Sequence, residues 1–449
     1  MYQPDTIVAI STPPGRGGIG IVRLSGPQAL TISRQLLTLA TPLEHTRARF
    51  TKILDEDGTT IDEAIATAFL APNSYTGEHL VEIAAHGSPV VLDHIVHRAL
   101  SLGARLAEPG EFSRRAFLAG RLDLTQAEAI HDLIAAQTLA QARTAAQQLG
   151  GALSRRIAPI KQQLLHLIAM LEAGMDFATG ELDDVDTMPT ERIATALTAI
   201  TTPLQQLADT FRYGSIQRNG IRLALVGRPN AGKSSLFNRL LDRDRAIVTA
   251  TPGTTRDTIE EIFSLNGIPI HLIDTAGLNT APTIDEAEAL GITRSREALA
   301  EADLILLVRD ATDNTPLADL DPLLHTRPTI RIANKVDLLA ATPPSPDELP
   351  TSALTGAGLD HLRSAILAHL RSGSASTDEA ALNNRRQHQA VTASLVALAA
   401  AVTANHAQLP HELLLLDLHA ALNALDTLTG TTTTDDILSL IFSTFCIGK

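Results

Sequence analysis

The sequence predicts a multidomain fold that combines α/β and all-α parts, and three observations carry this prediction. A chain of 449 residues is too long for one hydrophobic core, so about two to four domains are expected. Strand-like apolar segments alternate with Gly/Pro loops up to about residue 120, which indicates an α/β domain. Helix-periodic segments lie on both sides of residues 218–373. That stretch opens with a strand, a glycine loop and a helix, which favours a second α/β domain inserted into a helical one.

The composition describes a globular protein. Hydrophobic residues make up 44% and charged residues 19% of the chain, and no apolar run approaches the roughly 18 residues of a membrane span. No basic segment precedes an apolar one at the N-terminus, so no secretory signal is expected. A single cysteine, Cys446, excludes an intrachain disulfide and fits a reducing cytoplasm. The net charge of −14 has the wrong sign for broad nucleic-acid binding, so any RNA contact requires a local basic patch or a partner.

Residues 1–120 are predicted to form the N-terminal α/β domain. Its strands are expected at 6–10, 21–24, 64–70 and 80–84, and its helices at 27–39 and 89–101. The Gly/Pro-rich segment Ser11–Gly20 joins the first two strands and does not open a helix, so it is not a dinucleotide-binding fingerprint. Arg16 and Arg23 are candidates to meet an anionic ligand there, and a solvated loop is the alternative.

Residues 121–217 and 374–449 are predicted to form the two parts of a helical domain. Apolar residues recur there at helical spacing, as they do in the core of a helix bundle. The expected helices cover residues 124–149, 157–173, 191–211, 378–406, 411–428 and 435–444. Because these parts flank residues 218–373, an inserted domain explains the order more simply than separate domains do.

Residues 218–373 are predicted to form a Ras-like P-loop domain. The segment Gly227–Ser234 matches G-x-x-x-x-G-K-[ST] between the apolar strand Ile221–Val226 and a helix. Its glycines let backbone N–H groups converge on phosphate oxygens at a helix N-terminus. Lys233 is expected to reach the β- and γ-phosphates, and the Ser234 hydroxyl to ligate Mg²⁺. An ordinary glycine-rich turn is the alternative, and the flanking strand and helix argue against it.

Two motifs after the phosphate loop favour a bound nucleotide with Mg²⁺. Asp274 ends an apolar strand and begins Asp-Thr-Ala-Gly, so its carboxylate is expected to support the Mg²⁺ shell, and Gly277 can present its N–H to a γ-phosphate. The threonine-rich segment before it supplies Thr255 as a second hydroxyl for Mg²⁺.

Two later motifs favour guanine as the base. Asp337 in Asn334-Lys335-Val336-Asp337 can accept both the N1–H and the 2-amino group of guanine, a donor pair that adenine lacks. The segment Ser352-Ala353-Leu354 supplies a backbone contact to the base oxygen. The predicted GTP contacts are Asn230, Ala231, Gly232, Lys233, Ser234, Ser235, Thr249, Ala250, Thr251, Pro252, Gly253, Thr254, Thr255, Asp274, Thr275, Ala276, Gly277, Asn334, Lys335, Val336, Asp337, Ser352, Ala353 and Leu354.

Further stretches carry a resemblance over essentially the whole chain. They are Thr12–Gly18, Pro72–Glu78, Pro109–Ser113, Leu122–Ile130 and Phe445–Lys449. Together with the nucleotide motifs, they make the chain resemble the MnmE (also called TrmE) family of tRNA-modification GTPases. The N- and C-terminal signatures are specific to this family, whereas the nucleotide motifs occur in many GTPases.

The resemblance implies that the N-terminal domain binds 5-formyl- or 5,10-methylene-tetrahydrofolate at a homodimer interface. The matching positions are Arg23, Glu82, Arg121 and Lys449. Glu82 can accept from the 2-amino group and ring N–H of a pterin, and the cationic side chains can meet the carboxylate tail or the ring carbonyl. Cys446 matches a cysteine near the one-carbon unit, and a buried structural thiol is the alternative.

The resemblance also implies that GTP hydrolysis depends on K⁺ and on the pairing of two nucleotide domains. Asn230 matches the family's K⁺-ligating asparagine, with backbone carbonyls near Thr249, Thr251 and Thr254 completing the shell. K⁺ would then neutralise charge where other GTPases insert an arginine. Leu278 stands where other GTPases have a water-orienting glutamine, and Glu288 aligns with the glutamate that the family uses instead; Glu286 is a near alternative.

The function that the resemblance implies is tRNA modification gated by GTP hydrolysis. With an FAD- and NADH-dependent partner in a heterotetramer, the chain would help add an aminomethyl or carboxymethylaminomethyl group to carbon 5 of the wobble uridine of certain tRNAs. One alternative is a ribosome-assembly or other RNA-associated GTPase, but neither flank of the nucleotide domain shows a basic RNA-binding module. Another is a folate-dependent aminomethyl transferase with a vestigial nucleotide domain, and the intact nucleotide motifs argue against it.

Overall fold

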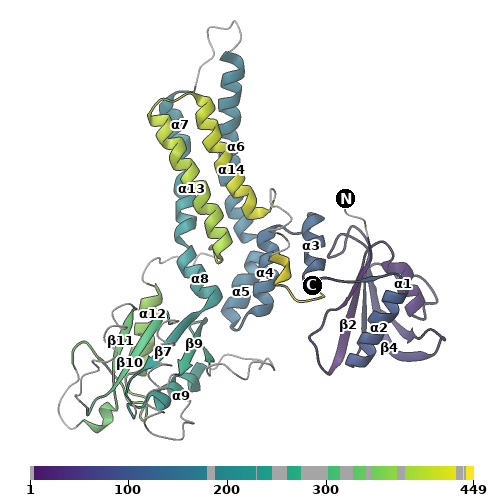
Figure 1. Ribbon diagram of the computed structural model, residues 1–449, viewed down its shortest axis with the longest axis horizontal. Helices are drawn as coiled ribbons and strands as arrows, with labels where there is room; N and C mark the ends of the chain where they lie inside the picture. The colour runs from purple at the N-terminus through teal and green to yellow at the C-terminus, as the bar shows by residue number, and fades with distance from the viewer. Residues whose placement is uncertain are drawn as a thin grey trace, which may run out of the picture. The chain divides into compact units, whose positions relative to one another are not determined.

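The computed structural model describes residues 5–178, 188–228, 230–244, 260–274, 302–313, 327–339, 345–371, 380–430, 438 and 441–448 (Figure 1). The chain divides into two compact units, each described by itself below. The first contains Met1–His131 together with Asp426–Lys449, and the second contains Asp132–Leu425. The α/β and all-α parts that the sequence predicts are both present.

The first unit is built on a six-stranded sheet with the order β3-β4-β5-β2-β1-β6. Its strands are β1 (Ile7–Ile10), β2 (Gly17–Ser25), β3 (Arg49–Leu54), β4 (Thr60–Phe69), β5 (Leu80–Gly87) and β6 (Arg105–Leu106). Neighbouring strands are antiparallel except for β1 and β6.

Helices α1 (Ala29–Leu36) and α2 (Pro89–Ser101) cover one face of this sheet. Val22, Ile83 and Ile95 belong to the fully buried core between them. Helix α3 (Glu111–Leu118) packs on the opposite face at the β1 end only, through Phe112. The described residues leave the β3–β4 end of that face uncovered, where Phe50 and Ile65 are exposed, whereas Arg23 and Glu82 lie on the same face nearer to α3.

Strand β2 corrects the predicted loop Ser11–Gly20, because Gly17–Gly20 already belong to the strand. Gly20 pairs with Ala85 on β5, and a Cβ on Gly20 would clash with the side chain of Leu92 on α2. Glycine is required here because the strand packs closely against a helix. Glycine is also common in turns, so the sequence alone does not show which of the two reasons applies. Strand β3 was also not predicted, whereas α2 has the bounds that were expected.

The second unit contains a helical bundle (Figure 1). Its helices are α5 (Leu139–Leu149), α6 (Ala152–Ala178), α7 (Thr190–Asp209), α8 (Phe211–Asn219) and α13 (Arg385–His406). Helices α4 (Leu124–Ala135) and α14 (His411–Thr429) each contain a boundary between the two units. Apolar side chains at helical spacing, among them Leu164, Leu197 and Leu398, are fully buried, as the stripes in the sequence predict.

Several helix boundaries differ from the prediction, and capping side chains explain two of them. The expected helix 124–149 is broken, because Thr138 forms a capping box that starts α5: its hydroxyl accepts from Gln141 N, and Gln141 Oε1 accepts from Thr138 N. Helix α13 begins after Asn384, whose side chain accepts from Gln387 N, and not at residue 378. Half of the expected helix 435–444 lies outside the described residues, and within the described half residues 438 and 441–443 are helical.

The nucleotide-domain segment of this unit holds a second six-stranded sheet with the order β12-β11-β10-β7-β9-β8. Its strands are β7 (Ile221–Val226), β8 (Glu260–Leu265), β9 (Ile268–Asp274), β10 (Leu304–Asp310), β11 (Thr329–Asn334) and β12 (Leu349–Pro350), with helices α9 (Lys233–Asp244) and α12 (Leu359–Arg371). All neighbours are parallel except β8 and β9. This is the Ras-like α/β arrangement, in which the carboxyl ends of the parallel strands form the ligand-binding edge.

Candidate functional site

The predicted phosphate loop lies between β7 and α9, at the carboxyl edge of the sheet. Asn230 and Gly232 both have left-handed backbone, with φ of 64° and 85°. A Cβ on Gly232 would clash with Asn334 Nδ2, so glycine is required there. Lys233 Nζ donates to Gly227 O and Arg228 O, both at 2.8 Å, which holds the ammonium inside the loop. The Ser234 side chain is exposed at the first turn of α9, where its hydroxyl is accessible to a cation.

Asn334 joins three segments of the predicted base pocket. Its side chain is fully buried; Nδ2 donates to Ala231 O at 3.0 Å, and Oδ1 accepts from Ala353 N at 3.1 Å. One amide therefore fixes the phosphate loop, the end of β11 and the segment 351–353 relative to one another. Ser352 Oγ donates to Asp337 Oδ1, and Asp337 itself is exposed. A carboxylate has about four acceptor positions, so it can accept two more donors from a base edge.

Asp310, at the end of β10, is a site residue that the sequence analysis missed. Its carboxylate accepts from Lys335 Nζ at 2.8 Å, and Lys335 has a left-handed backbone with φ of 65°. Partial burial opposes ionisation of Asp310, but hydrogen bonds from Lys335 and Thr312 outweigh it and lower its pKa to about 2. The signal was present in the sequence as an acidic residue just after an apolar strand-like run, Leu304–Val308.

Part of the predicted nucleotide site lies outside the described residues. This holds for residues 249–255, for Thr275, Ala276 and Gly277, and for Glu286 and Glu288. The backbone of Asp274 is described: it ends β9 and pairs with Leu225 on β7, next to the phosphate loop.

The first unit brings together two of the four residues proposed for folate. Arg23 on β2 and Glu82 on β5 form a cross-strand pair, in which Arg23 Nη2 and Nε donate to Glu82 Oε1 at 2.7 and 3.0 Å. Both side chains are partly exposed, at 19% and 26%. Arg121 is exposed beside Gly77, and Lys449 lies outside the described residues.

The C-terminal segment docks against this pair within the first unit. Gly448 O accepts from Arg23 Nη1 at 3.3 Å and from Ser11 Oγ at 3.0 Å. Gly110 N donates to Cys446 O at 3.4 Å, and the Cys446 side chain is exposed. The exposure of Cys446 argues against the alternative of a buried structural thiol. The segment lies against the Gly/Pro-rich loop that the sequence singled out.

Aromatic rings form the floor under Arg23. Its guanidinium carbon lies 5.8 Å from the ring centroid of Tyr75 and 5.6 Å from that of Phe112, within the range of cation–π attraction. The Tyr75 hydroxyl is 2.7 Å from Ser113 Oγ, and burial raises the pKa of Tyr75. An arginine held between a carboxylate and two rings offers a planar, cationic surface to a flat polar ligand.

A buried arginine fixes the loop that carries Tyr75. Arg115 on α3 is only 3% exposed and donates to Glu78, Asp5 and Glu111. Because Glu78 follows Tyr75 by three residues, this ion network positions the aromatic floor. Arg115 is a second residue that the sequence analysis missed, although it follows the Pro109–Ser113 signature closely.

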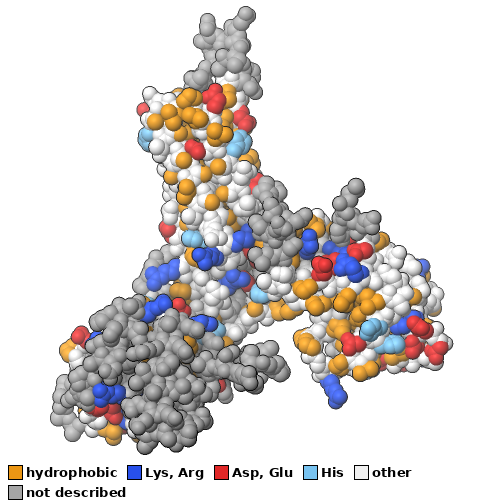
Figure 2. All heavy atoms as spheres, in the orientation of Figure 1, with side chains coloured by type: hydrophobic (Ala, Val, Ile, Leu, Met, Phe, Trp, Pro, Cys, Tyr) orange, Lys and Arg blue, Asp and Glu red, His pale blue; other side chains and the backbone are white. Residues whose placement is uncertain are grey.

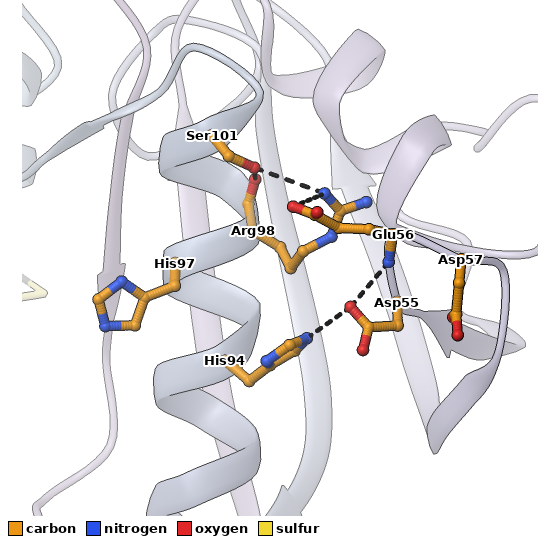
Figure 3. Close-up of a pocket in the computed structure, with 7 residues that line it drawn as sticks. All are labelled: Asp55, Glu56, Asp57, His94, His97, Arg98 and Ser101. Carbon is orange, nitrogen blue, oxygen red and sulfur yellow. Dashed lines mark hydrogen bonds and ion pairs between the residues drawn. The ribbon is translucent and has the colours of Figure 1, made fainter.

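A separate cavity of about 470 Å³ opens on the first unit between α2 and the β3–β4 turn (Figure 3). Its lining residues are Asp55, Glu56, Asp57, His94, His97, Arg98 and Ser101. His94 Nε2 faces Asp55 Oδ1 at 3.2 Å, and Arg98 Nη1 donates to Glu56 Oε1 at 3.0 Å (Figure 3). Across the described part of the chain, no three His, Cys, Asp or Glu side chains are grouped to hold a metal. None of the described helices is long and apolar enough to cross a membrane.

Comparison with known proteins covers both units. The family model described as the MnmE helical domain matches residues 124–446, and the one described as the GTP-binding protein TrmE N-terminus matches residues 6–121. The tRNA modification GTPase MnmE of Koribacter versatilis is 52% identical over 100% of both chains. Proteins with the same name from Roseiflexus castenholzii and Methylococcus capsulatus are 42% identical over 100% and 44% identical over 99% of both chains.

Among solved structures, two are similar to part of the chain. The G domain of the FeoB iron transporter of T. maritima is 30% identical, with a TM-score of 0.25, covering 33% of this chain and 98% of that domain. Era of Aquifex aeolicus bound to GDP and AlF₄⁻ is 28% identical, with a TM-score of 0.26, covering 39% of this chain and 66% of Era.

Proposed function

The chain belongs to the MnmE (TrmE) family of tRNA modification GTPases, and on that premise we propose that it hydrolyses GTP in the course of tRNA modification. The base pocket is the observation that carries the GTP assignment. Asn334 ties the phosphate loop to the segment that supplies Ala353, and Ser352 orients Asp337. An exposed, oriented carboxylate selects a base with two adjacent donors, which is guanine.

Replacing Asp337 with asparagine tests this assignment. The amide would no longer accept both guanine donors, but its NH₂ group can donate to the 2-carbonyl oxygen of xanthine. We expect the affinity for GTP to fall about 100-fold and XTP to become the preferred substrate. Nucleotide titrations of Asp337→Asn and of a control, Asp360→Asn on α12, measure this. Unchanged GTP affinity in Asp337→Asn would contradict the guanine assignment.

We assign the binding of the nucleotide's phosphates to the phosphate loop, at the end of the pocket opposite the base. Lys233 already sits within the loop, in contact with Gly227 O and Arg228 O, and can move to the β- and γ-phosphates of a bound nucleotide. Ser234 and Thr255 would hold Mg²⁺, which Asp274 would support from outside its first shell. Glu288 would orient the attacking water. Mg²⁺ would neutralise charge on the phosphate oxygens.

We also assign a K⁺ site to Asn230 and to the backbone near Thr249, Thr251 and Thr254. The left-handed backbone of Asn230 supports this, because it turns the residue within the loop that cradles the phosphates. K⁺ would supply the charge that an arginine supplies in other GTPases. Replacing K⁺ by Na⁺ should slow GTP hydrolysis about tenfold or more, and an unchanged turnover number would remove this assignment.

The Arg23–Glu82 pair supports a tetrahydrofolate site in the N-terminal domain. Glu82 can accept from the amino-pyrimidine edge of the pterin, while Arg23, Arg121 and Lys449 meet the ring carbonyl or the carboxylate tail. Tetrahydrofolate would carry the one-carbon unit that is transferred, as 5-formyl- or 5,10-methylene-tetrahydrofolate. The docked C-terminal segment supports a role for Cys446 beside that unit, because Gly448 O contacts Arg23 directly.

The uncovered sheet face supports a homodimer. Phe50 pairs with Ile65, Ile65 with Ala84 and Ala84 with Ile21, so an apolar row crosses four strands on the face opposite α1 and α2. Phe50 is 66% and Ile65 is 49% exposed. An apolar row of this kind, continuous with the Arg23–Glu82 pair, fits a second copy of this chain, and the folate site would then lie at the dimer interface.

The full proposal is modification of carbon 5 of the wobble uridine with a carboxymethylaminomethyl or aminomethyl group. An FAD- and NADH-dependent protein would act with the chain in a cytoplasmic heterotetramer. The proposed domains are the N-terminal domain (1–120), the first helical part (121–217), the GTPase domain (218–373) and the second helical part (374–449). GTP hydrolysis would open and close the dimer and gate the chemistry.

A further inference from the structure

Acidic residues are distributed unevenly along this acidic chain. Although the net charge is −14, residues 133–171, 210–241 and 380–411 contain no aspartate or glutamate. All three stretches carry arginines, and none of them is a basic module in sequence. The fold determines whether their charges add up, because electrostatic potentials sum over neighbours in space.

The three stretches meet at the base of the helical bundle in the second unit. The contacts that join them all involve the segment by which the chain returns from the nucleotide domain. They are Arg156 Nη1 to Ala380 O at 3.3 Å, Gln148 Nε2 to Ala381 O at 3.0 Å, Leu382 N to Thr210 Oγ1 at 3.1 Å, and the stacked rings of Phe211 and His388, 4.2 Å apart.

Five arginines lie on the helix starts next to these contacts, and we call them the basic junction: Arg155, Arg156, Arg212, Arg385 and Arg386. Arg155, Arg212 and Arg385 are exposed, at the starts of α6, α8 and α13, and the other two are half-buried. Figure 2 shows Lys and Arg side chains gathered over the base of α6, α8 and α13.

Nearby acidic groups are engaged within the fold. Asp132, which flanks the first stretch, pairs with Arg218 at 2.6 Å and accepts from Asn383 Nδ2. Asp209, which flanks the second, accepts from Gln205 Nε2 at 2.9 Å. The charge of Asp132 is balanced by Arg218, whereas Asp209 is exposed and keeps its charge, and Asp378 and Glu379, which flank the third stretch, lie outside the described residues. Among the described side chains between the three helices, the five guanidinium groups outnumber the carboxylates, so their summed charge is positive.

We propose that the basic junction binds the sugar–phosphate backbone of tRNA. This inference rests on the proposed function and adds the surface by which the RNA is held. Guanidinium groups match phosphate oxygens through paired hydrogen bonds, and arginine is the cation that this lysine-poor chain uses. The negative net charge of the chain does not prevent RNA binding at such a cluster. At 0.1 M salt the Debye length is about 10 Å, so carboxylates farther away repel the phosphates only weakly.

The position of the junction links the RNA to the nucleotide domain. Helix α8, which carries Arg212, ends at Asn219, and β7 begins two residues later. RNA held at the junction would therefore contact the segment that leads into the phosphate loop.

The test is tRNA binding by the full-length chain, measured by fluorescence anisotropy with a labelled tRNA that has a wobble uridine. The triple variant Arg155→Glu/Arg212→Glu/Arg385→Glu is compared with the wild type over about 50–250 mM salt. At about 100 mM salt we expect the triple variant to bind tRNA about tenfold or more weakly than the wild type. The slope of log affinity against log salt concentration should also be smaller, by the equivalent of about two to three phosphate contacts. Each single Arg→Gln change should give a smaller loss.

Arg192→Glu is the matched control. Arg192 is exposed near the start of α7, about 25 Å along the helix from α8. The Arg192→Glu variant should bind tRNA with the affinity of the wild type. In this control and in the junction variants alike, the rate of GTP hydrolysis and the melting temperature should equal those of the wild type. If the triple variant misfolds, the single variants carry the test.

Equal tRNA affinity of the wild type and the triple variant would overturn the inference, as would a wild-type chain that does not bind tRNA. It would also fail if the variants lost a protein partner while keeping tRNA affinity, since the junction would then be a protein interface. None of these outcomes contradicts the proposed function, which is tested separately by the state of the wobble uridine in cells.

Discussion

At the scale of single residues, Asn334, Lys335 and Asp337 are held by groups that lie far from them in sequence. The Asn334 amide contacts the phosphate loop, and Asp310 from the neighbouring strand holds Lys335 in a left-handed backbone conformation. A lysine in that conformation costs on the order of 1–3 kcal/mol, which its surroundings must offset. The Asp310–Lys335 ion pair is therefore part of the base pocket.

Asp310→Ala should destabilise the chain at neutral pH by about 1–2 kcal/mol. The pKa of Asp310 is lowered to about 2, against 3.8 for an ordinary aspartate. A lowered carboxyl pKa gives stability that is present above the unfolded value and is lost as pH falls through the folded one. The difference between variant and wild type should therefore narrow from about pH 4 to about pH 2, as measured by urea unfolding.

The control for this experiment is Asp360→Ala, since that side chain is 85% exposed on α12. It should show no comparable loss at any pH. A difference between Asp310→Ala and the wild type that stays constant from neutral pH to about pH 2 would contradict the assigned role of the ion pair.

Residue-level prediction from the sequence was strongest where a motif specifies backbone geometry. The phosphate loop lies between a strand and a helix, as expected, and its contact with GTP stays a prediction, as does that of the Asn334–Asp337 segment. Asp310 and Arg115 were missed because each acts through a neighbour that only the fold supplies. In the sequence, a charged residue that belongs to no motif cannot be distinguished from a solvent-exposed charge on the surface.

At the scale of elements, the six strands of the first unit leave one face partly bare. Helices α1 and α2 bury one side, and α3 covers only the β1 end of the other. The exposed row that includes Phe50 and Ile65 requires a cover, because contiguous apolar surface of this kind marks interaction sites.

Ile65→Lys should convert the proposed homodimer into a monomer and weaken folate binding with it. A lysine in the centre of the apolar row would have to be desolvated in the dimer. Sedimentation analysis should show the molecular mass halved, and calorimetry should show the affinity for 5-formyl-tetrahydrofolate falling about tenfold or more.

Val90→Lys is the matched control, because Val90 is 78% exposed on α2, which covers the opposite face of the sheet. It should change neither mass nor affinity. A dimeric Ile65→Lys variant would remove the sheet face as the interface. A monomer with unchanged folate affinity would separate the folate site from the dimer.

Helices and strands were predicted correctly where an apolar pattern extends over many residues. They were missed where a single capping contact or a glycine determines the boundary. The long helices α6, α7, α13 and α14 of the bundle were predicted from apolar residues at helical spacing. The break before α5 was missed because a Thr138–Gln141 capping box needs no proline or glycine. The Gly17–Gly20 segment was read as a loop because the same residue type serves turns and close strand–helix contacts.

At the scale of the whole molecule, the fold assembles sites from distant segments. The last described residues dock beside Arg23 near the start of the chain, and three acid-free stretches form the basic junction. Sequence alone identified the C-terminal signature but not its contact with Ser11, and it showed no basic module. The family resemblance was confirmed over both units, because identity over the full length supports it independently of any single motif.

Mass spectrometry of wobble uridines tests the central claim most directly. It compares tRNA from cells that lack this chain with tRNA from cells in which the wild-type chain, Lys233→Ala or Asp274→Ala is restored. The account predicts loss of the aminomethyl-type group at carbon 5, restored by the wild type and by neither variant. A full complement of modified uridine in cells without the chain would contradict the tRNA assignment and leave a GTPase with another client.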